Sequence, residues 1–229
     1  MPESVSVRAL AVGPSPYLQF VPRAAAILRL FIYPGISLAF AFLSGCGSSG
    51  TSPTQTKAPI FQVRVVTSFP HDSNAFTQGL EIEGEKIYES TGREGFSSVR
   101  HVDLQTGEVS LKHDLPDDCF GEGLTIMGDQ IYQITYKNRT CFVYEKDTLK
   151  KTKQFNYSGE GWGLANDGKY LFMTDKTSTI SIRDPETFDV VRKLRVKDGR
   201  KSIVELNELE YFDGHIWANI WRQDKIAKI

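Results

Sequence analysis

Cys119-Phe120-Gly121-Glu122-Gly123-Leu124-Thr125 is the stretch that decides the fold, because three other segments repeat its pattern. Residues 76–81, 161–164 and 206–210 each place a polar or aromatic residue two positions before a leucine. The four leucines, at positions 80, 124, 164 and 209, lie 44, 40 and 45 residues apart. Short strands that repeat with a period in the forties are typical of β-propeller blades, and the alternative is chance similarity among glycine-rich turns.

A β-hairpin signature follows each leucine. The turns contain Gly84, Gly128, Gly168 and Gly214, and each is followed by an apolar and aromatic run. Glycine in a short turn between two strand-like runs indicates a hairpin. Third strands are then expected over residues 99–103, 141–144, 180–184 and 225–229. The sequence therefore predicts an all-β fold in which four propeller blades are visible.

The bulk composition is that of a globular protein. Among 229 residues, 40% are hydrophobic and 24% are charged, and the formal net charge of −1 gives no basis for nucleic-acid binding. Three cysteines are too few for a disulfide-dense scaffold. Cys119 and Cys141 are expected at the same end of the second blade, and either a disulfide between them or two separate buried thiols is consistent with the sequence.

Residues 1–46 have the features of an export signal. A segment with Arg23 and Arg29 precedes an apolar run over residues 30–42, and small residues lead to Cys46. This order is that of a secretory signal, and the run is short for a membrane span. Leu-Ser-Gly-Cys resembles the bacterial lipobox, so we expect lipidation at Cys46 and location in the cell envelope or periplasm. An ordinary signal peptide or a buried helix is the alternative.

The remaining chain divides into a linker and the propeller. Residues 47–59 are rich in Gly, Ser, Thr and Pro and are predicted to be a flexible tether. The propeller is expected over residues 60–229. In propellers a segment such as 61–66, before the first blade, commonly supplies an outer strand to the last blade and closes the ring, but four visible repeats leave that closure incomplete. Because the chain ends at Ile229 within the fourth repeat, we expect that it is truncated and lacks its C-terminal blade.

Two rings of residues are expected at one mouth of the central channel. The inner strands begin at the first ring, and the returning hairpin strands end at the second. The first ring is Gln78, Glu122, Trp162 and Asn207, and the second is Gly92, Tyr136, Lys176 and Trp221.

One carboxylic acid among amides and aromatic rings suits acid–base chemistry with a single proton carrier. Burial is expected to raise the pKa of Glu122. The alternatives are that Glu122 only accepts hydrogen bonds from backbone amides and that Trp162 and Trp221 only pack the blades. The four histidines show no ligand spacing, and no metal site is predicted.

Seven stretches resemble the plant-type glutaminyl-peptide cyclotransferases, the glutamine cyclotransferase family of plants and bacteria. They are residues 76–81, 88–92, 97–100, 120–125, 159–164, 206–210 and 218–221. The resemblance implies a five-bladed β-propeller, here reduced to about four blades. It also implies an enzyme that converts the N-terminal glutamine of a peptide to pyroglutamate with release of ammonia. Members of this type do not use the catalytic zinc of the animal enzymes, so no cofactor is expected.

The resemblance also assigns roles to individual residues. Glu122 would be the proton shuttle, and Gln78 and Asn207 would hydrogen-bond the substrate. The pocket walls would be Phe76, Phe120, Trp162 and Trp221, with Tyr136 where the family usually has tryptophan. A lysine that the family's last blade supplies near the site is not in this chain.

The expected partner is a peptide or protein with an N-terminal glutamine. Membrane contact is expected only through the lipid anchor, and the protein is expected to be a monomer. The alternative function is a non-catalytic propeller that binds peptides or cell-envelope partners. A propeller hydrolase with several acidic metal ligands is disfavoured, because the first ring contains only one acid, Glu122.

Overall fold

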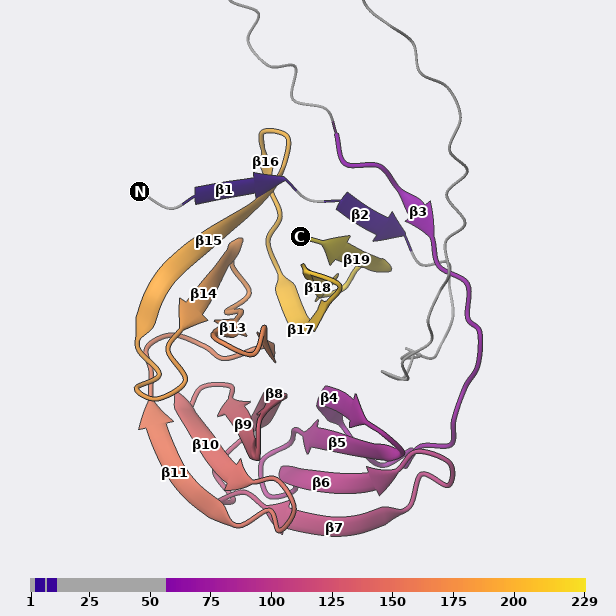
Figure 1. Cartoon of the computed structure of the whole chain (residues 1–229), viewed down its shortest axis with the longest axis vertical. Coiled ribbons are helices and arrows are strands. Elements are labelled where there is room, and N and C mark those ends of the chain that lie inside the picture. The colour runs from indigo at the N-terminus through magenta and orange to yellow at the C-terminus, as the bar shows by residue number, and fades with distance from the viewer. Residues whose placement is uncertain (1–2, 7, 12–56) are drawn as a thin grey trace, which may run out of the picture.

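The computed structural model describes residues 3–6, 8–11 and 57–229, and the regular structure in these residues is entirely β. Four sheets are arranged around a common axis, as expected for propeller blades, and the repeat strands within each sheet pair in an antiparallel manner (Figure 1). Within the described part of the chain there is no helix that could cross a membrane.

The blades follow one another in chain order. The first blade contains β4 (Thr77–Glu83), β5 (Lys86–Thr91), β6 (Ser98–Asp103) and β7 (Val109–Asp114). The second contains β8 (Gly121–Met127), β9 (Gln130–Thr135), β10 (Thr140–Glu145) and β11 (Lys151–Asn156). The third contains β12 (Leu164–Asn166), β13 (Leu171–Met173), β14 (Thr179–Arg183) and β15 (Val190–Asp198), with β16 (Lys201–Ser202) beside β15. The fourth contains β17 (Leu206–Phe212), β18 (His215–Ile220) and β19 (Lys225–Lys228).

The hairpin prediction is confirmed. The first two strands of every blade pair in an antiparallel manner, and the predicted third strands correspond to β6, β10, β14 and β19. The inner strand β8 is buried over most of its length, whereas the outer strands β7 and β11 are largely exposed. This gradient follows from the radial arrangement, because the inner strands are surrounded by neighbouring blades.

Most of the core lies between successive blades, and a smaller cluster that includes Ile82 belongs to blade one alone. Val99 and Leu124 belong to the apolar cluster between blades one and two, and Ile134 and Leu164 to the cluster between blades two and three. Ile180 packs with Ala218 between blades three and four. Burial of apolar side chains between sheets therefore holds neighbouring blades together.

The two cysteines lie in different clusters. Cys119 is buried with the side chains between blades one and two, and Cys141 is buried between blades two and three. Both are free thiols, so the structure has two separate buried thiols and no disulfide between Cys119 and Cys141. The reason is that the two side chains pack on opposite faces of the second blade.

The inner strands approach each other closely where glycine precedes the repeat leucine. A Cβ on Gly79 would lie 2.5 Å from the backbone nitrogen of Leu124, and one on Gly123 would overlap the backbone nitrogen of Leu164. A Cβ on Gly163 would likewise overlap the carbonyl oxygen of Asn207. The repeat needs glycine here because backbone packs directly against backbone.

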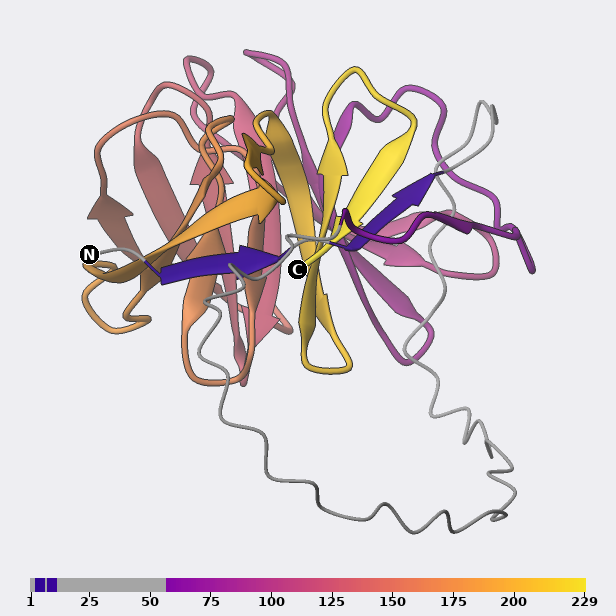
Figure 2. The same cartoon turned by 90° about the horizontal axis from the view of Figure 1, so that it is seen from above.

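Two short strands from the amino-terminal region join the sheets. β1 (Glu3–Ser6) pairs in parallel with β15, and β2 (Arg8–Ala11) pairs with β19 and, in parallel, with β3 (Phe61–Gln62). Figure 2 shows β1 and β2 along one side of the ring. These pairings were not predicted, and they cover strand edges that would otherwise expose backbone hydrogen-bonding groups.

The structure describes the segment before the first blade, at residues 61–66, but not the predicted lipidation site. β3 joins the sheet of the fourth blade through β2, so the segment before the first blade does reach that sheet, as a two-residue strand. The predicted lipidation site at Cys46, and residues 12–56 around it, lie outside the described residues.

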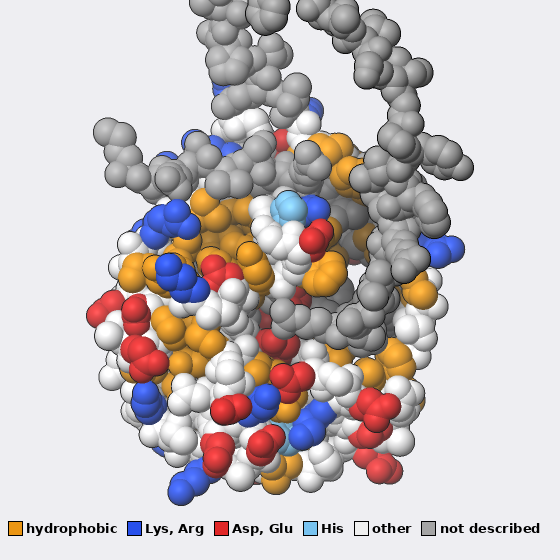
Figure 3. All heavy atoms as spheres, in the orientation of Figure 1, with side chains coloured by type: hydrophobic (Ala, Val, Ile, Leu, Met, Phe, Trp, Pro, Cys, Tyr) orange, Lys and Arg blue, Asp and Glu red, His pale blue; other side chains and the backbone are white. Residues whose placement is uncertain are grey.

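Charged side chains of both signs are interspersed on the face shown in Figure 3. Ion pairs in the described residues include Lys146 with Glu83 (2.8 Å), near the hairpin turn of blade one, and Lys112 with Asp114 (2.6 Å), at the opposite end of that blade. No single sign dominates this face, in agreement with the net charge of −1.

Candidate active site

Three of the four first-ring residues, Gln78, Glu122 and Asn207, lie in β-bulges, whereas Trp162 precedes β12. The register between inner and second strands shifts between Thr77 and Gly79, and between Gly121 and Leu124. The bulges therefore contain Gln78 and Glu122. A third shift, between Leu206 and Leu209, contains Asn207 and Glu208. Such bulges redirect side chains away from the sheet.

The second ring lies opposite the first, as the hairpin alignment predicted. The Gly92 N–H donates to the Phe76 carbonyl oxygen (2.8 Å), and the Tyr136 N–H donates to the Phe120 carbonyl oxygen (2.9 Å). The ends of the returning strands and the starts of the inner strands therefore meet at one mouth.

Glu122 and Gln78 are brought into direct contact. The Gln78 side-chain amide donates to Glu122 Oε2 at 2.9 Å, and Glu122 is only 6% exposed. Burial raises the pKa of Glu122 to about 9; the Gln78 hydrogen bond opposes this shift, and the Glu160 carboxylate adds to it. The carboxyl group is therefore neutral at physiological pH, and the expected direction of its pKa shift is confirmed.

The glycines beside Glu122 allow this burial. A Cβ on Gly121 would lie 2.5 Å from the Thr91 carbonyl oxygen of blade one. The Gly121 N–H also donates to Ser97 Oγ at 3.1 Å. Blade one therefore packs against the backbone that holds Glu122 and excludes water from it.

Aromatic side chains form two walls. The rings of Phe76 and Phe120 meet edge to face at 5.9 Å between centroids, and Phe120 meets Tyr136 in the same way at 6.1 Å. Trp162 and Trp221 make a third edge contact at 5.3 Å. Trp162 is buried, whereas Phe76 (42%) and Trp221 (40%) are exposed at the rim.

Cations stack on the outer rings of these walls. Arg93 lies 4.8 Å from the centroid of Phe76, and Arg222 lies 4.0 Å from that of Trp221. Lys137 lies 4.8 Å from the centroid of Tyr136. These contacts orient the exposed rings from the solvent side.

Asn207 and Lys176 lie at the predicted ends of their strands, but in residues 57–229 no hydrogen bond or ion pair joins either of them to Glu122. The Asn207 carbonyl oxygen accepts from Thr174 Oγ1 at 2.7 Å. Lys176 Nζ lies 3.3 Å from Glu160 Oε2, and that oxygen also accepts from the Trp162 indole N–H at 3.2 Å. Glu160 thus orients Trp162, a role that the sequence motif did not reveal.

A second buried acid, Glu208, was missed. Both of its carboxylate oxygens are inaccessible to solvent, and within the described residues the one hydrogen bond that stabilises their charge is a weak contact with the Leu209 backbone N–H. Burial, followed by the charges of Glu210, Glu122 and Glu81, raises its pKa well above the ordinary value. One signal was available: Glu208 occupies the position at which the other three repeats have glycine.

Two hollows lie away from Glu122. One, of about 610 Å³, is lined by residues of blades two and three, including Tyr157 and Arg183. The other, of about 520 Å³, opens at the hairpin-turn end near Glu81 and Asn166. In residues 57–229, no group of three or more His, Cys, Asp and Glu side chains is arranged to hold a metal ion.

Comparison with known proteins gives one consistent result. The family model described as glutamine cyclotransferase matches residues 38–229. A glutaminyl-peptide cyclotransferase of Arabidopsis thaliana is 41% identical over 210 residues, which cover 90% of this chain and 66% of the relative. The chain thus spans about two thirds of that relative's length.

A solved structure supports the fold independently. The glutaminyl cyclase of Myxococcus xanthus matches with a TM-score of 0.68 and 31% identity, over 72% of this chain and 70% of that chain. With the family model covering most of the sequence, this chain belongs to the glutamine cyclotransferase family.

Proposed function

We propose that the mouth around Glu122 converts the N-terminal glutamine of a peptide to pyroglutamate. The α-amino nitrogen of the substrate attacks the side-chain amide carbon, and a nitrogen–carbon bond closes the ring. The bond from that carbon to the side-chain nitrogen breaks, and ammonia leaves. One proton must move from the attacking nitrogen to the leaving nitrogen.

Glu122 is suited to move that proton because its carboxyl group is buried and neutral. With a pKa of about 9, it carries a proton at neutral pH. Its hydroxyl donates a proton to the leaving nitrogen while its other oxygen accepts a proton from the attacking amine. The Glu122 carboxyl group is therefore protonated both before and after the reaction. One carboxyl thus acts as both acid and base without a net charge developing on it.

The neighbouring side chains position the substrate. Gln78 holds Glu122 in one orientation through its 2.9 Å hydrogen bond, and Asn207 supplies a second amide at the mouth. Phe76, Phe120 and Tyr136 form an apolar wall on one side, and Trp162 with Trp221 forms another. Flat walls restrict the glutamine side chain to conformations near the closed ring and exclude water.

The observation that carries this proposal is the buried, neutral Glu122 in contact with Gln78. The test is incubation of the protein with a peptide that begins with glutamine, followed by mass spectrometry for loss of one ammonia. We expect Glu122→Gln to lower kcat by a factor of about 10² to 10⁴, the usual contribution of a positioned acid–base group. Glu85→Gln, at an exposed turn position, is the matched control.

Two results would change this assignment. Undiminished turnover by Glu122→Gln would exclude the proton-shuttle role. Saturable binding of the peptide by the wild-type protein, with no loss of ammonia, would instead support the non-catalytic peptide-binding propeller.

We also propose export and lipid attachment at Cys46, supported by the order of charged, apolar and small residues before it. Cleavage before Cys46 would remove β1 and β2, and with β2 the strand that joins β19 to β3. Labelling of cells with a radioactive fatty acid, comparing wild type with Cys46→Ala, tests the attachment. An unlabelled wild-type protein that begins upstream of residue 46 would contradict it.

A further inference from the structure

An ionic cluster with a buried centre lies in blade one. At its centre is Glu89 of β5, whose side chain is 0% exposed. Its Oε1 accepts from Thr77 Oγ1 at 2.6 Å and lies 3.0 Å from His71 Nε2. Its Oε2 has no hydrogen bond, and the nearest cation is Arg100 Nη1 at 3.9 Å. A buried carboxylate is costly unless it is paired, so Glu89 depends on these neighbours.

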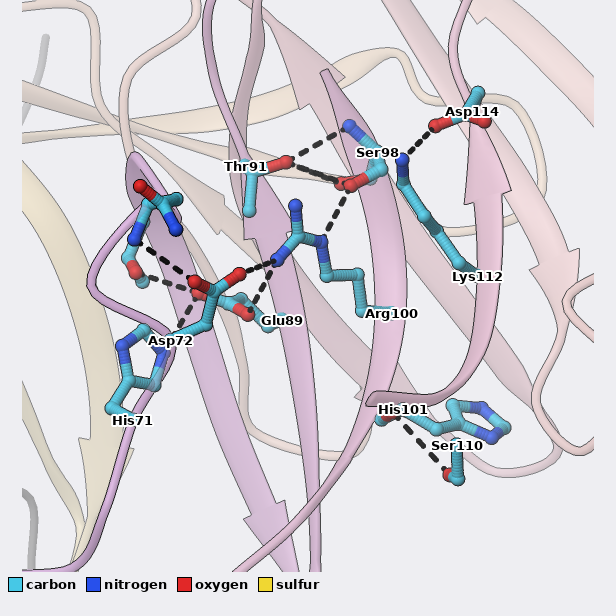
Figure 4. Close-up of polar contacts among 12 residues, drawn as sticks. His71, Asp72, Glu89, Thr91, Ser98, Arg100, His101, Ser110, Lys112 and Asp114 are labelled. Carbon is cyan, nitrogen blue, oxygen red and sulfur yellow. Dashed lines mark hydrogen bonds and ion pairs between the residues drawn. The ribbon is translucent and has the colours of Figure 1, made fainter. Parts of the chain in front are cut away.

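The neighbours of Glu89 are themselves fixed. Arg100 Nη1 lies 3.1 Å from Asp72 Oδ2, and Arg100 Nε donates to Ser98 Oγ at 2.8 Å. Figure 4 shows His71 and Asp72, from the segment before β4, directed toward Glu89 and Arg100 on the paired strands β5 and β6. The cluster therefore ties the segment that leads into β4 to the two strands beside it.

Thr77 connects this cluster to the mouth. It is paired with Thr91 in the ladder, and Gly79 is paired with Ser90, so Gln78 between them is the extra residue of the bulge. An extra residue has no ladder partner to fix its direction. Its orientation depends on its two neighbours: Gly79 packs on the backbone of Leu124, and Thr77 is held by Glu89.

The contacts form one continuous path. Glu89 accepts the Thr77 hydroxyl hydrogen bond, Thr77 precedes the bulged Gln78, and the Gln78 amide donates to Glu122 Oε2 at 2.9 Å. We propose that Glu89 and Thr77 are positioning residues for the site, which hold the bulge so that Gln78 meets Glu122. Their kinetic role rests on the proposed cyclotransferase function, but the geometry they maintain does not.

A purely structural role would give a different result from a positioning role. If the Thr77 hydroxyl only stabilised blade one, its removal would lower the free energy of unfolding and leave the Glu122 site intact in the folded fraction. If it positions Gln78, its removal weakens the hydrogen bond to Glu122 in the folded protein. Because that hydrogen bond lowers the pKa of Glu122, weakening it raises this pKa further.

The experiment compares Thr77→Val, which removes the hydroxyl with little change in shape, with Thr77→Ser, which keeps it. Thr152→Val is the matched control. Thr152 lies on the outer strand β11, away from the mouth, and its hydroxyl donates to the Val143 carbonyl oxygen of β10 at 3.2 Å. The readouts are kcat and KM with a glutamine-initiated peptide, and the pKa of Glu122. This pKa is followed by NMR on protein labelled with carbon-13 at the glutamate carboxyl, and the Glu122 signal is assigned by its loss in Glu122→Gln.

We expect Thr77→Val to lower kcat roughly tenfold with little change in KM, and to raise the Glu122 pKa by about half a unit or more. Thr77→Ser and Thr152→Val are expected to match wild type in both. Glu89→Gln keeps an oxygen that accepts the Thr77 hydrogen bond but loses the charge that attracts His71 and Arg100. It is expected to change both readouts in the same direction as Thr77→Val, and it is the second variant if Thr77→Val does not fold.

The outcomes separate the two proposals. If wild type has no turnover but Thr77→Val still raises the Glu122 pKa, the proposed function fails and the positioning role stands. An unchanged Glu122 pKa and an unchanged kcat in folded Thr77→Val would overturn the positioning role. A loss that Thr77→Ser does not restore would also overturn it, because the effect would not depend on the hydroxyl group.

Discussion

The side-chain amide of Gln78 donates a 2.9 Å hydrogen bond to Glu122 across the boundary between blades one and two. The two residues occupy equivalent positions in consecutive repeats, and each lies in a β-bulge at the start of an inner strand. The bond has two effects: it fixes the orientation of the buried carboxyl group, and it lowers a pKa that burial raises. The pH dependence of turnover should depend on this balance.

The first prediction concerns the pH dependence of turnover. Gln78→Leu removes a donor that stabilises the ionised form of Glu122, so the pKa of about 9 should rise and the carboxyl should stay protonated to higher pH. We expect the basic limb of the kcat profile to move upward by about half a unit to one unit, with kcat itself lowered roughly tenfold. Gln105→Leu, at an exposed turn, is the control. A basic limb that stays in place would show that it does not report on Glu122.

The second prediction concerns Glu208, whose two carboxylate oxygens are buried and whose charge is not paired with a cation in the described part of the chain. A carboxyl group whose pKa is raised by folding destabilises the folded protein progressively as pH rises above its unfolded value of 4.5. The neutral Glu208→Gln should therefore be more stable than wild type at pH 8, by about 1 to 3 kcal/mol in the free energy of unfolding. The advantage should vanish near pH 4, where both side chains are neutral. Urea denaturation at the two pH values measures it, and an equal difference at both would contradict the argument.

The sequence was sufficient to place Gln78 and Glu122 together, because the repeat period itself specifies which positions are equivalent. Gln78 and Glu122 are 44 residues apart, as are Leu80 and Leu124, so aligning the repeats places them at the same end of adjacent blades. The role of Glu208 could not be derived in this way. Its effect depends on where its Cβ points relative to the neighbouring inner strands, which is a property of the assembled ring.

The ionic cluster of blade one could not be predicted from the sequence, for a similar reason. His71 and Glu89 belong to a connecting segment and a returning strand, and no fixed spacing relates a loop residue to a strand residue. The pairing of β2 with β19 was also unpredictable, because a four-residue strand far along the chain from its partner carries too little pattern to identify it. Long-range contacts outside the repeat therefore require the structure.

The third prediction tests the close approach of the inner strands. A methyl group at residue 123 would overlap the backbone nitrogen of Leu164, and this backbone cannot retreat without separating β8 from β12. We expect Gly123→Ala to lower the free energy of unfolding by about 2 to 4 kcal/mol. Gly95→Ala is the comparison, since its added Cβ meets open space and only its positive φ of 77° is strained, at a cost of about 1 kcal/mol. Equal losses in urea denaturation would show that overlap is not the cause.

The fourth prediction contrasts two histidines of blade one. The hydrogen bond and charge of Glu89 raise the pKa of His71 above its ordinary value of 6.5. Protonated His71 therefore stabilises the folded protein fully below pH 6.5, and this stabilisation is lost as the pH rises through the raised pKa. Burial lowers the pKa of His101, so that site favours the folded state above pH 6.5 and loses this contribution as pH falls. The destabilisation caused by His71→Gln should therefore be larger at pH 5.5 than at pH 8, and that caused by His101→Gln should be larger at pH 8. Because His71 is partly open to solvent, its pH-dependent part should be below about 1 kcal/mol. Parallel denaturation series at both pH values measure the two slopes, and slopes of the same sign would mean that the Glu89 carboxylate does not hold the charge of His71.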